Sequence, residues 1–291
     1  MGAARQSQQG PAAIGSKCLI VGAAYSIASS AIAALLGPVS RLQPTWGNAV
    51  IWLLVGTLSC ASLAPFILRS TWSRLNTLLA VWGVMVFVRS LGLGIEGSLF
   101  KPAEATATVA GTLSGTFVSF LVAWFSVALL LPERTTSPAQ AAGQSNWWGW
   151  TWRVLLVGLA YFLFYFVFGA TNALLYTRSF YENNPKYGLS LPPPATIFLA
   201  QLVRGPLFGL GSLFIVRAAN MPRRQTGVWL GLLLFVVGGL GPYLETTFCS
   251  MPLGFNLATL AELFLQNFLT GLVAARLLVP GPTPRGDQMI E

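Results

Sequence analysis

Eight apolar stretches, each long enough to cross a membrane as a helix, dominate this chain of 291 residues. A helix needs about 20 apolar residues to span the roughly 30 Å of bilayer hydrocarbon, and the stretches lack the alternating pattern of barrel strands. Hydrophobic residues make up 54% of the chain and charged residues 9%, which excludes an ordinary water-soluble globule. The sequence predicts an all-α, polytopic membrane helical bundle with transmembrane helices near 18–37, 48–68, 76–99, 109–131, 154–176, 196–216, 226–247 and 256–279.

The second half of the chain repeats the first, which indicates a duplication. The offset between matching segments is 136 residues at first and 148 or 149 later. The matching segments are Lys17–Tyr25 with Arg153–Tyr161, Phe66–Arg69 with Phe214–Arg217, Leu91–Glu96 with Leu240–Glu245, and Phe120–Pro132 with Phe268–Pro280. A unit of four helices crosses the membrane an even number of times, so we expect two parallel four-helix repeats with the working site between them.

These repeats divide the chain into five parts. We expect a disordered cytoplasmic N-terminus (1–16), the first repeat (17–132), a cytoplasmic linker with a tryptophan anchor (133–152), the second repeat (153–280) and a cytoplasmic tail (281–291). The first apolar stretch lacks a convincing cleavage site and is expected to be retained. Eleven of the 17 Lys and Arg residues lie on the side of the termini, against four on the other, so the positive-inside rule predicts cytoplasmic termini.

Composition also limits the metal binding and catalysis that the chain can support. The chain has no histidine, the commonest metal ligand and general base, and its three cysteines lie in separate segments without CxxC spacing. We therefore expect no metal, no cofactor and no catalytic activity. The net charge of +9 is interpreted as a topology signal with contact to anionic membrane lipids, and no nucleic-acid partner is predicted. The Gly, Ala, Leu and Arg content favours a bacterial source, hence the inner (plasma) membrane.

Five charged residues fall within the apolar stretches, all in the half of the bilayer away from the termini. Each costs about 2.5–3.5 kcal/mol at a helix centre, so they should face the bundle interior and meet one another. Seven-residue spacing places Arg89 and Glu96 on one helix face, which predicts that they pair. Arg204 is expected to pair with Glu262 or Glu245. The candidate substrate- or ion-binding residues, including nearby amides, are Arg89, Glu96, Gln201, Arg204, Glu245, Glu262 and Gln266.

Three acids against two bases leave one carboxylate without a basic partner. That carboxylate either holds a proton or awaits a cation or cationic substrate. A structural interpretation competes with this one, because buried Arg–Glu pairs can fix helix register without moving anything.

Three functions remain open. The leading hypothesis is a small proton- or cation-coupled transporter or permease with a polar pocket in the outer half of the bilayer. The alternative is a non-catalytic membrane subunit that scaffolds a complex or binds lipid or pigment, and it is favoured by small-residue helix faces suited to close packing. An intramembrane enzyme acting on a lipid-linked substrate is the weakest, because no nucleophile stands beside a base at helical spacing.

Overall fold

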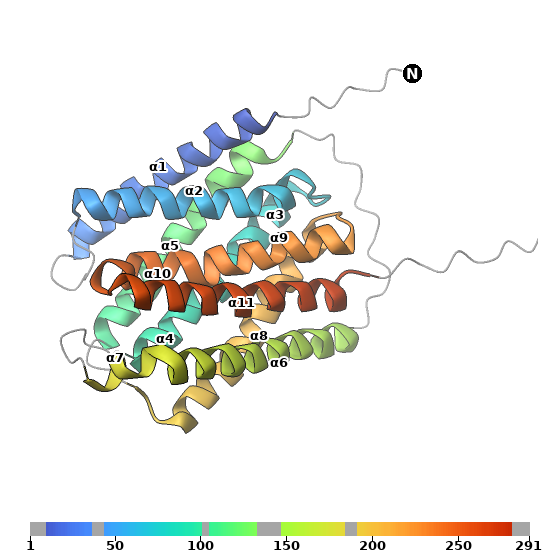
Figure 1. The fold of residues 1–291 in the computed structure, drawn as a ribbon. Helices are drawn as coiled ribbons and strands as arrows, with labels where there is room; N and C mark the ends of the chain where they lie inside the picture. The colour runs from blue at the N-terminus through green and yellow to red at the C-terminus, as the bar shows by residue number, and fades with distance from the viewer. Residues whose placement is uncertain (1–9, 37–43, 101–104, 133–146, 184–190, 281–291) are drawn as a thin grey trace, which may run out of the picture.

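A computed structural model describes residues 10–36, 44–100, 105–132, 147–183 and 191–280. These residues form a bundle of long helices lying side by side (Figure 1). The helices of the first half are α1 (Pro11–Leu36), α2 (Trp46–Leu68), α3 (Arg74–Val84) continued by the π-helical segment η2 (Met85–Leu91) and α4 (Gly92–Phe100), and α5 (Ala105–Leu130). The second half contains α6 (Trp147–Asn172), η4 (Ala173–Thr177) and α7 (Arg178–Asn183), then α8 (Pro194–Ala218), α9 (Arg223–Phe235) with η6 (Val236–Leu240) and α10 (Gly241–Thr246), the short 3₁₀ turn η7 (Phe248–Ser250), and α11 (Leu253–Leu278).

Eight of the resulting helical spans are long and apolar enough to cross a membrane. The predicted fold class, an all-α bundle of eight transmembrane helices, is confirmed, and the chain is a multi-pass integral membrane protein. We call the end of the bundle at which α1 begins and α11 ends the termini end, and the opposite end the far end (Figure 1).

The two halves meet symmetrically at the termini end. The loop after α2 and the loop after α8 form an isolated antiparallel bridge between Ser70 and Ala219, positions that are 149 residues apart and therefore equivalent in the repeat. The amide of Thr71 donates to the Ala218 carbonyl at 3.0 Å, and the amide of Asn220 donates to the Arg69 carbonyl at 3.1 Å. Each bond maps onto the other when the halves are exchanged, so the pseudo-twofold axis passes through this bridge.

Helix packing follows the same symmetry. A Cβ added to Gly56 would lie 3.0 Å from the Cα of Gly22, and a Cβ added to Gly205 would lie 2.4 Å from the carbonyl oxygen of Gly158. The two pairs are related by the repeat offset, and each lets the first two helices of its half approach at backbone distance. The equivalent π-helical segments η2 and η6 likewise end at the matched residues Leu91 and Leu240.

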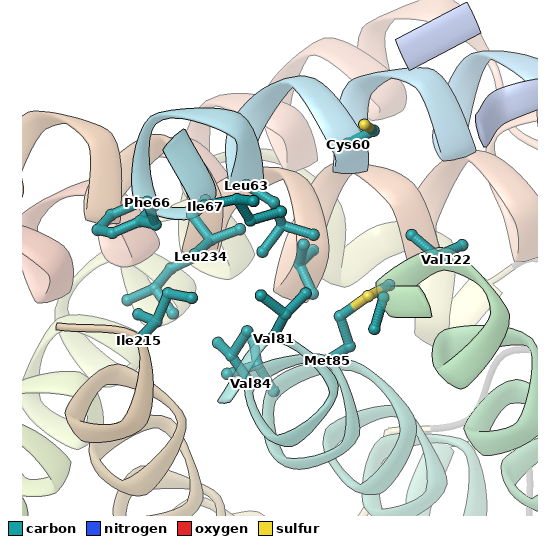
Figure 2. Close-up of a cluster of buried hydrophobic side chains, with 14 of the residues drawn as sticks. Cys60, Leu63, Phe66, Ile67, Val81, Val84, Met85, Val122, Ile215 and Leu234 are labelled. Carbon is teal, nitrogen blue, oxygen red and sulfur yellow. The ribbon is translucent and has the colours of Figure 1, made fainter. Parts of the chain in front are cut away.

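The termini half of the bundle is filled by apolar side chains. Leu63, Phe66 and Ile67 of α2 pack against Val81 and Val84 of α3, with residues of α8 and α9 closing the cluster (Figure 2). All of these side chains are almost completely buried. Elements from both halves therefore share one dry core, because α3 packs on α8 of the other half and α2 contacts α9.

Several predicted boundaries need correction. Residues 11–16, expected to be disordered, are the first turns of α1, which opens on Pro11, a residue suited to the first helical position, followed by two alanines. The tryptophans assigned to the linker belong to α6, which begins at Trp147; Trp150 lies between the guanidinium groups of Arg153 and Arg217. The helices α2 and α8 run without interruption through Pro65 and Pro206. Residues 1–9, 133–146 and 281–291 lie outside the described part, so the predictions for them stay predictions.

Candidate functional site

A cavity of about 560 Å³ occupies the far half of the bundle. It is lined from the first half by residues of α1, α2, η2, α4 and α5, and from the second half by residues of α6, α7, η6, α10 and α11. Its lining includes residues of both π-helical segments, with Arg89 on η2 and Gly238 and Gly239 on η6. The wider π turn is a common device for placing side chains at functional sites. The cavity therefore lies between the two repeats.

Of the predicted site residues, the cavity lining includes Arg89, Glu96, Glu245 and Glu262. Arg204 is placed behind Glu96, outside the lining. Gln201 and Gln266 are buried in helix contacts and do not line the cavity either, although both had been assigned to the polar site. Helix packing thus brings four of the candidates to the cavity and leaves three around it.

The first ionic cluster consists of Tyr25, Arg89 and Glu245, and we call it the Arg89 cluster. Arg89 Nη2 lies 2.5 Å from Glu245 Oε2, and the two side chains are only 5% and 8% exposed. The Tyr25 hydroxyl donates to Glu245 Oε1 at 2.5 Å and accepts a hydrogen bond from Arg89 Nη2. Charge-assisted hydrogen bonds therefore link three buried polar groups, although Arg89 Nη1 has no hydrogen-bond partner among the described residues.

The second ionic cluster consists of Glu96, Tyr161, Gln201 and Arg204, and we call it the Arg204 cluster. Arg204 Nη1 donates to Glu96 Oε1 at 2.6 Å and to Gln201 Oε1 at 3.2 Å. The guanidinium also lies over the rings of Tyr161 and Phe208, with its central carbon 5.7 and 5.9 Å from their centroids. Arg204 is 2% exposed but Glu96 is 30% exposed, so only the carboxylate of this pair reaches the cavity.

Both clusters join the two repeats. Glu96 and Glu245 are equivalent positions, as are Tyr25 and Tyr161, and each arginine pairs with the glutamate of the other repeat. The arginines themselves are not equivalent, since Arg89 lies on η2 of the first repeat and Arg204 on α8 of the second. The same arrangement of tyrosine, arginine and glutamate is thus built twice, with the arginine supplied from a different helix each time.

The predicted ion pairs were wrong. Arg89 and Glu96 do not pair although seven residues separate them, because η2 places a π-helical turn before Leu91 and so rotates the residues that follow. Arg204 pairs with neither Glu262 nor Glu245, since its guanidinium bonds to Glu96 of α4 instead. The charges do meet inside the bundle, but each arginine takes its partner from the opposite repeat.

Glu262 is the carboxylate left over. No Lys or Arg among the described residues forms a salt bridge with it. Its Oε2 accepts a hydrogen bond of 2.6 Å from Asn172 Nδ2 of α6, and its Oε1 would lie 3.1 Å from a Cβ on Gly169. The acid that was predicted to lack a basic partner is therefore Glu262 of α11. Gly169 of the neighbouring helix α6 leaves room for its carboxylate.

Aromatic side chains complete the wall near Glu262. Tyr165, Tyr181 and Tyr243 line the cavity together with Phe255, and Trp52 of α2 also belongs to the lining. Tyr181 belongs to α7 and lies 6.3 Å, between ring centroids, from Phe255 at the start of α11. The segment after α6 thus contributes Thr177 and Tyr181 to the cavity lining.

Sequence reasoning missed the two tyrosines of the clusters and Asn172. The signal for the tyrosines was present, because Tyr25 and Tyr161 end the first pair of matching segments. Asn172 gave a weaker signal, a single amide near the end of an aromatic stretch. In the described residues, no three His, Cys, Asp or Glu side chains converge in a way that could hold a metal ion.

Comparison with known proteins gives no further guide to this arrangement. No protein-family model matches the chain, and no curated protein sequence and no solved structure matches it either. The chemistry of the site must therefore be argued from its own residues. It offers a cavity with both polar and apolar lining, two neutralised ion pairs and one carboxylate whose charge no described side chain balances.

Proposed function

We propose that the protein is a small proton- or cation-coupled transporter and that the cavity is its substrate site. The observation that carries this proposal is a cavity at the interface of two repeats that contains Glu262, a carboxylate with no basic partner among the described residues. Transporters built from repeats place their binding sites at such interfaces near the middle of the membrane. A buried ionisable group that is not neutralised by a neighbour is the usual carrier of a proton or a coupling ion.

The packed apolar core supports a transporter conformation that is closed at the termini end. The termini half is packed with Leu63, Phe66, Ile67 and their neighbours, and the bridge between Ser70 and Ala219 joins the two repeats below them. With the termini in the cytoplasm of a bacterial cell, as the distribution of Lys and Arg supports, the cavity belongs to the outer half of the inner membrane. Transport would then require the bridge to open so that the cavity becomes accessible from the cytoplasm.

The alternative, a non-catalytic membrane subunit, is favoured by one observation. The repeats are tied together at two levels, by the ion pairs in the far half and by the backbone bridge at the termini end. A body joined at both levels suits a rigid scaffold or a lipid-binding subunit. The two functions differ in whether the bridge opens during the working cycle.

A disulfide across the bridge tests this difference. Ser70 and Ala219 form a non-hydrogen-bonded antiparallel pair, in which Cα atoms lie about 4.5 Å apart, within the range of about 4.4–6.8 Å that a disulfide accepts. The variant Ser70→Cys/Ala219→Cys should therefore cross-link on oxidation. A protease site inserted within 133–146 reveals the cross-link, because the cut halves then stay together on a gel without reductant.

The functional measurement uses proteoliposomes that enclose a pH-sensitive dye. We expect imposed gradients of Na⁺, K⁺ or organic cations to drive proton flux through the wild type. Oxidised Ser70→Cys/Ala219→Cys should show only the leak of protein-free liposomes, and reductant should restore the flux. The single-cysteine variants, treated alike, are the matched controls. Absence of flux in the wild type, or equal flux in the cross-linked protein, would contradict transport and favour the subunit.

A further inference from the structure

We infer that the cavity binds a monovalent organic cation with an apolar body, and that Glu262 is its charge partner. This inference rests on the transport function proposed above and names the substrate class of that site. It follows from three properties of the cavity, namely its size, its charge balance and the chemistry of its wall.

The size of the cavity sets the scale of the ligand. At about 560 Å³ it lies within the range of about 300–1,000 Å³ that is typical of pockets for small organic molecules. A bare metal ion or a proton would leave nearly all of this space unfilled. Ile32, Ile51, Leu93 and Val118 contribute apolar surface to the wall, which suits a ligand with a hydrocarbon or aromatic body.

The charge balance of the cavity determines the sign of the charge that the ligand should carry. Glu245 is neutralised by Arg89 within the lining, and Glu96 is neutralised by Arg204 directly behind it. Glu262 adds one negative charge that no described Lys or Arg balances. A ligand carrying one positive charge makes the ionised site neutral, whereas an anionic ligand would face an uncompensated carboxylate in a low-dielectric space.

The wall supplies the remaining chemistry. Six aromatic side chains line the cavity, from both repeats, namely Tyr25, Trp52, Tyr165, Tyr181, Tyr243 and Phe255. The faces of aromatic rings attract organic cations, because the ring quadrupole places negative charge on the faces. A carboxylate beside several rings is the combination that recognises ammonium and phosphonium groups. Asn172, which holds one oxygen of Glu262, fixes the carboxylate against α6 and leaves its other oxygen unbonded among the described residues.

The test measures equilibrium binding of tritiated tetraphenylphosphonium to the full-length protein in detergent, by scintillation proximity, with empty micelles as background. We expect saturable binding at one site per chain. Glu262→Gln should weaken it about tenfold or more, as expected when one partner of a buried charge pair is truncated. Glu262→Asp, which keeps the charge, should retain part of the affinity.

Two controls separate charge recognition from other causes. Glu182→Gln removes a carboxylate that is exposed and paired with Arg178 on α7, and it should leave binding unchanged. Triphenylphosphine oxide, a neutral compound of similar shape, should fail to compete. Glu262→Gln keeps an oxygen that can accept the hydrogen bond from Asn172, and an unchanged size-exclusion profile shows that the variant is folded.

Each outcome decides the inference. Absence of saturable binding in the wild type, equal binding by folded Glu262→Gln, or full competition by the neutral compound would overturn it, the last indicating an apolar lipid site. Binding needs no flux, so a protein that binds the cation without carrying protons retains this inference and loses the transport proposal. Proton flux without cation binding would overturn this inference and leave the transport proposal standing.

Discussion

The Arg89 and Arg204 clusters occupy related places in the two repeats, yet they differ in completeness. In the Arg89 cluster the tyrosine hydroxyl joins arginine and glutamate, and all three groups are buried. In the Arg204 cluster the hydroxyl of Tyr161 has no hydrogen-bond partner among the described residues, and Glu96 is partly exposed to the cavity. The Arg89 cluster is thus a buried joint between the two halves, whereas the Arg204 cluster exposes a carboxylate to the cavity.

The largest expected effect on stability comes from removing one charge of the Arg89 cluster. Arg89→Met should destabilise the protein by about 3–5 kcal/mol, because it leaves Glu245 charged, buried and without its arginine. The double variant Arg89→Met/Glu245→Gln should recover much of this loss, with a coupling energy of about 0.5–3 kcal/mol. Reversible unfolding in mixed micelles of increasing SDS content compares Arg89→Met, Glu245→Gln, the double variant and the wild type. Simple additivity of the single changes would show that the two side chains do not interact.

The Arg204 cluster should respond unequally to its two single changes. Glu96→Gln strands an arginine that is 2% exposed, whereas Arg204→Met strands a carboxylate that is 30% exposed and can be hydrated from the cavity. We expect Glu96→Gln to cost about 1–3 kcal/mol more than Arg204→Met, which is the penalty for a buried group left unsatisfied. The same unfolding assay compares them. Equal losses of stability in the two variants, as expected for the Arg89 cluster, would show that the two clusters do not differ in this respect.

The smallest expected effects compare the two equivalent tyrosines. Tyr25→Phe removes a hydroxyl that bonds to both charges of its cluster and should cost about 1–3 kcal/mol. Tyr161→Phe removes a buried hydroxyl without a partner and should be neutral or slightly stabilising, within about 0.5 kcal/mol of the wild type. Thermal unfolding followed by size-exclusion chromatography ranks the pair. A larger loss for Tyr161→Phe would mean that its hydroxyl is bonded.

The fold was accessible from the sequence because long apolar stretches leave few alternatives in a bilayer. Hydrophobic length identifies each helix, and the bridge between Ser70 and Ala219 joins the loops that follow the matching segments Phe66–Arg69 and Phe214–Arg217. Helix ends were less accurate, since α1 begins at Pro11 and α6 at Trp147, where polar or interfacial residues extend a helix beyond its apolar part.

The pairing of the charges was not accessible, because it depends on packing between distant helices. Ideal helical spacing joined Arg89 to Glu96, but the π-helical segment η2 changes the rotation between them. Nothing in the apolar sequence before Leu91 signals such a segment. Composition did give the count of acids over bases, and the structure then located the excess at Glu262, which a count alone cannot do.

The exchange of partners between the repeats also has a consequence for synthesis of the chain. Glu96 precedes Arg204 by 108 residues, and Arg89 precedes Glu245 by 156 residues. At about 5–20 residues per second, a ribosome needs on the order of ten seconds to make the missing partners. Until then the newly inserted third helix carries one positive and one negative charge, which together sum to zero. The charges of Arg89 and Glu96 therefore cancel within the membrane before Glu245 and Arg204 have been synthesised.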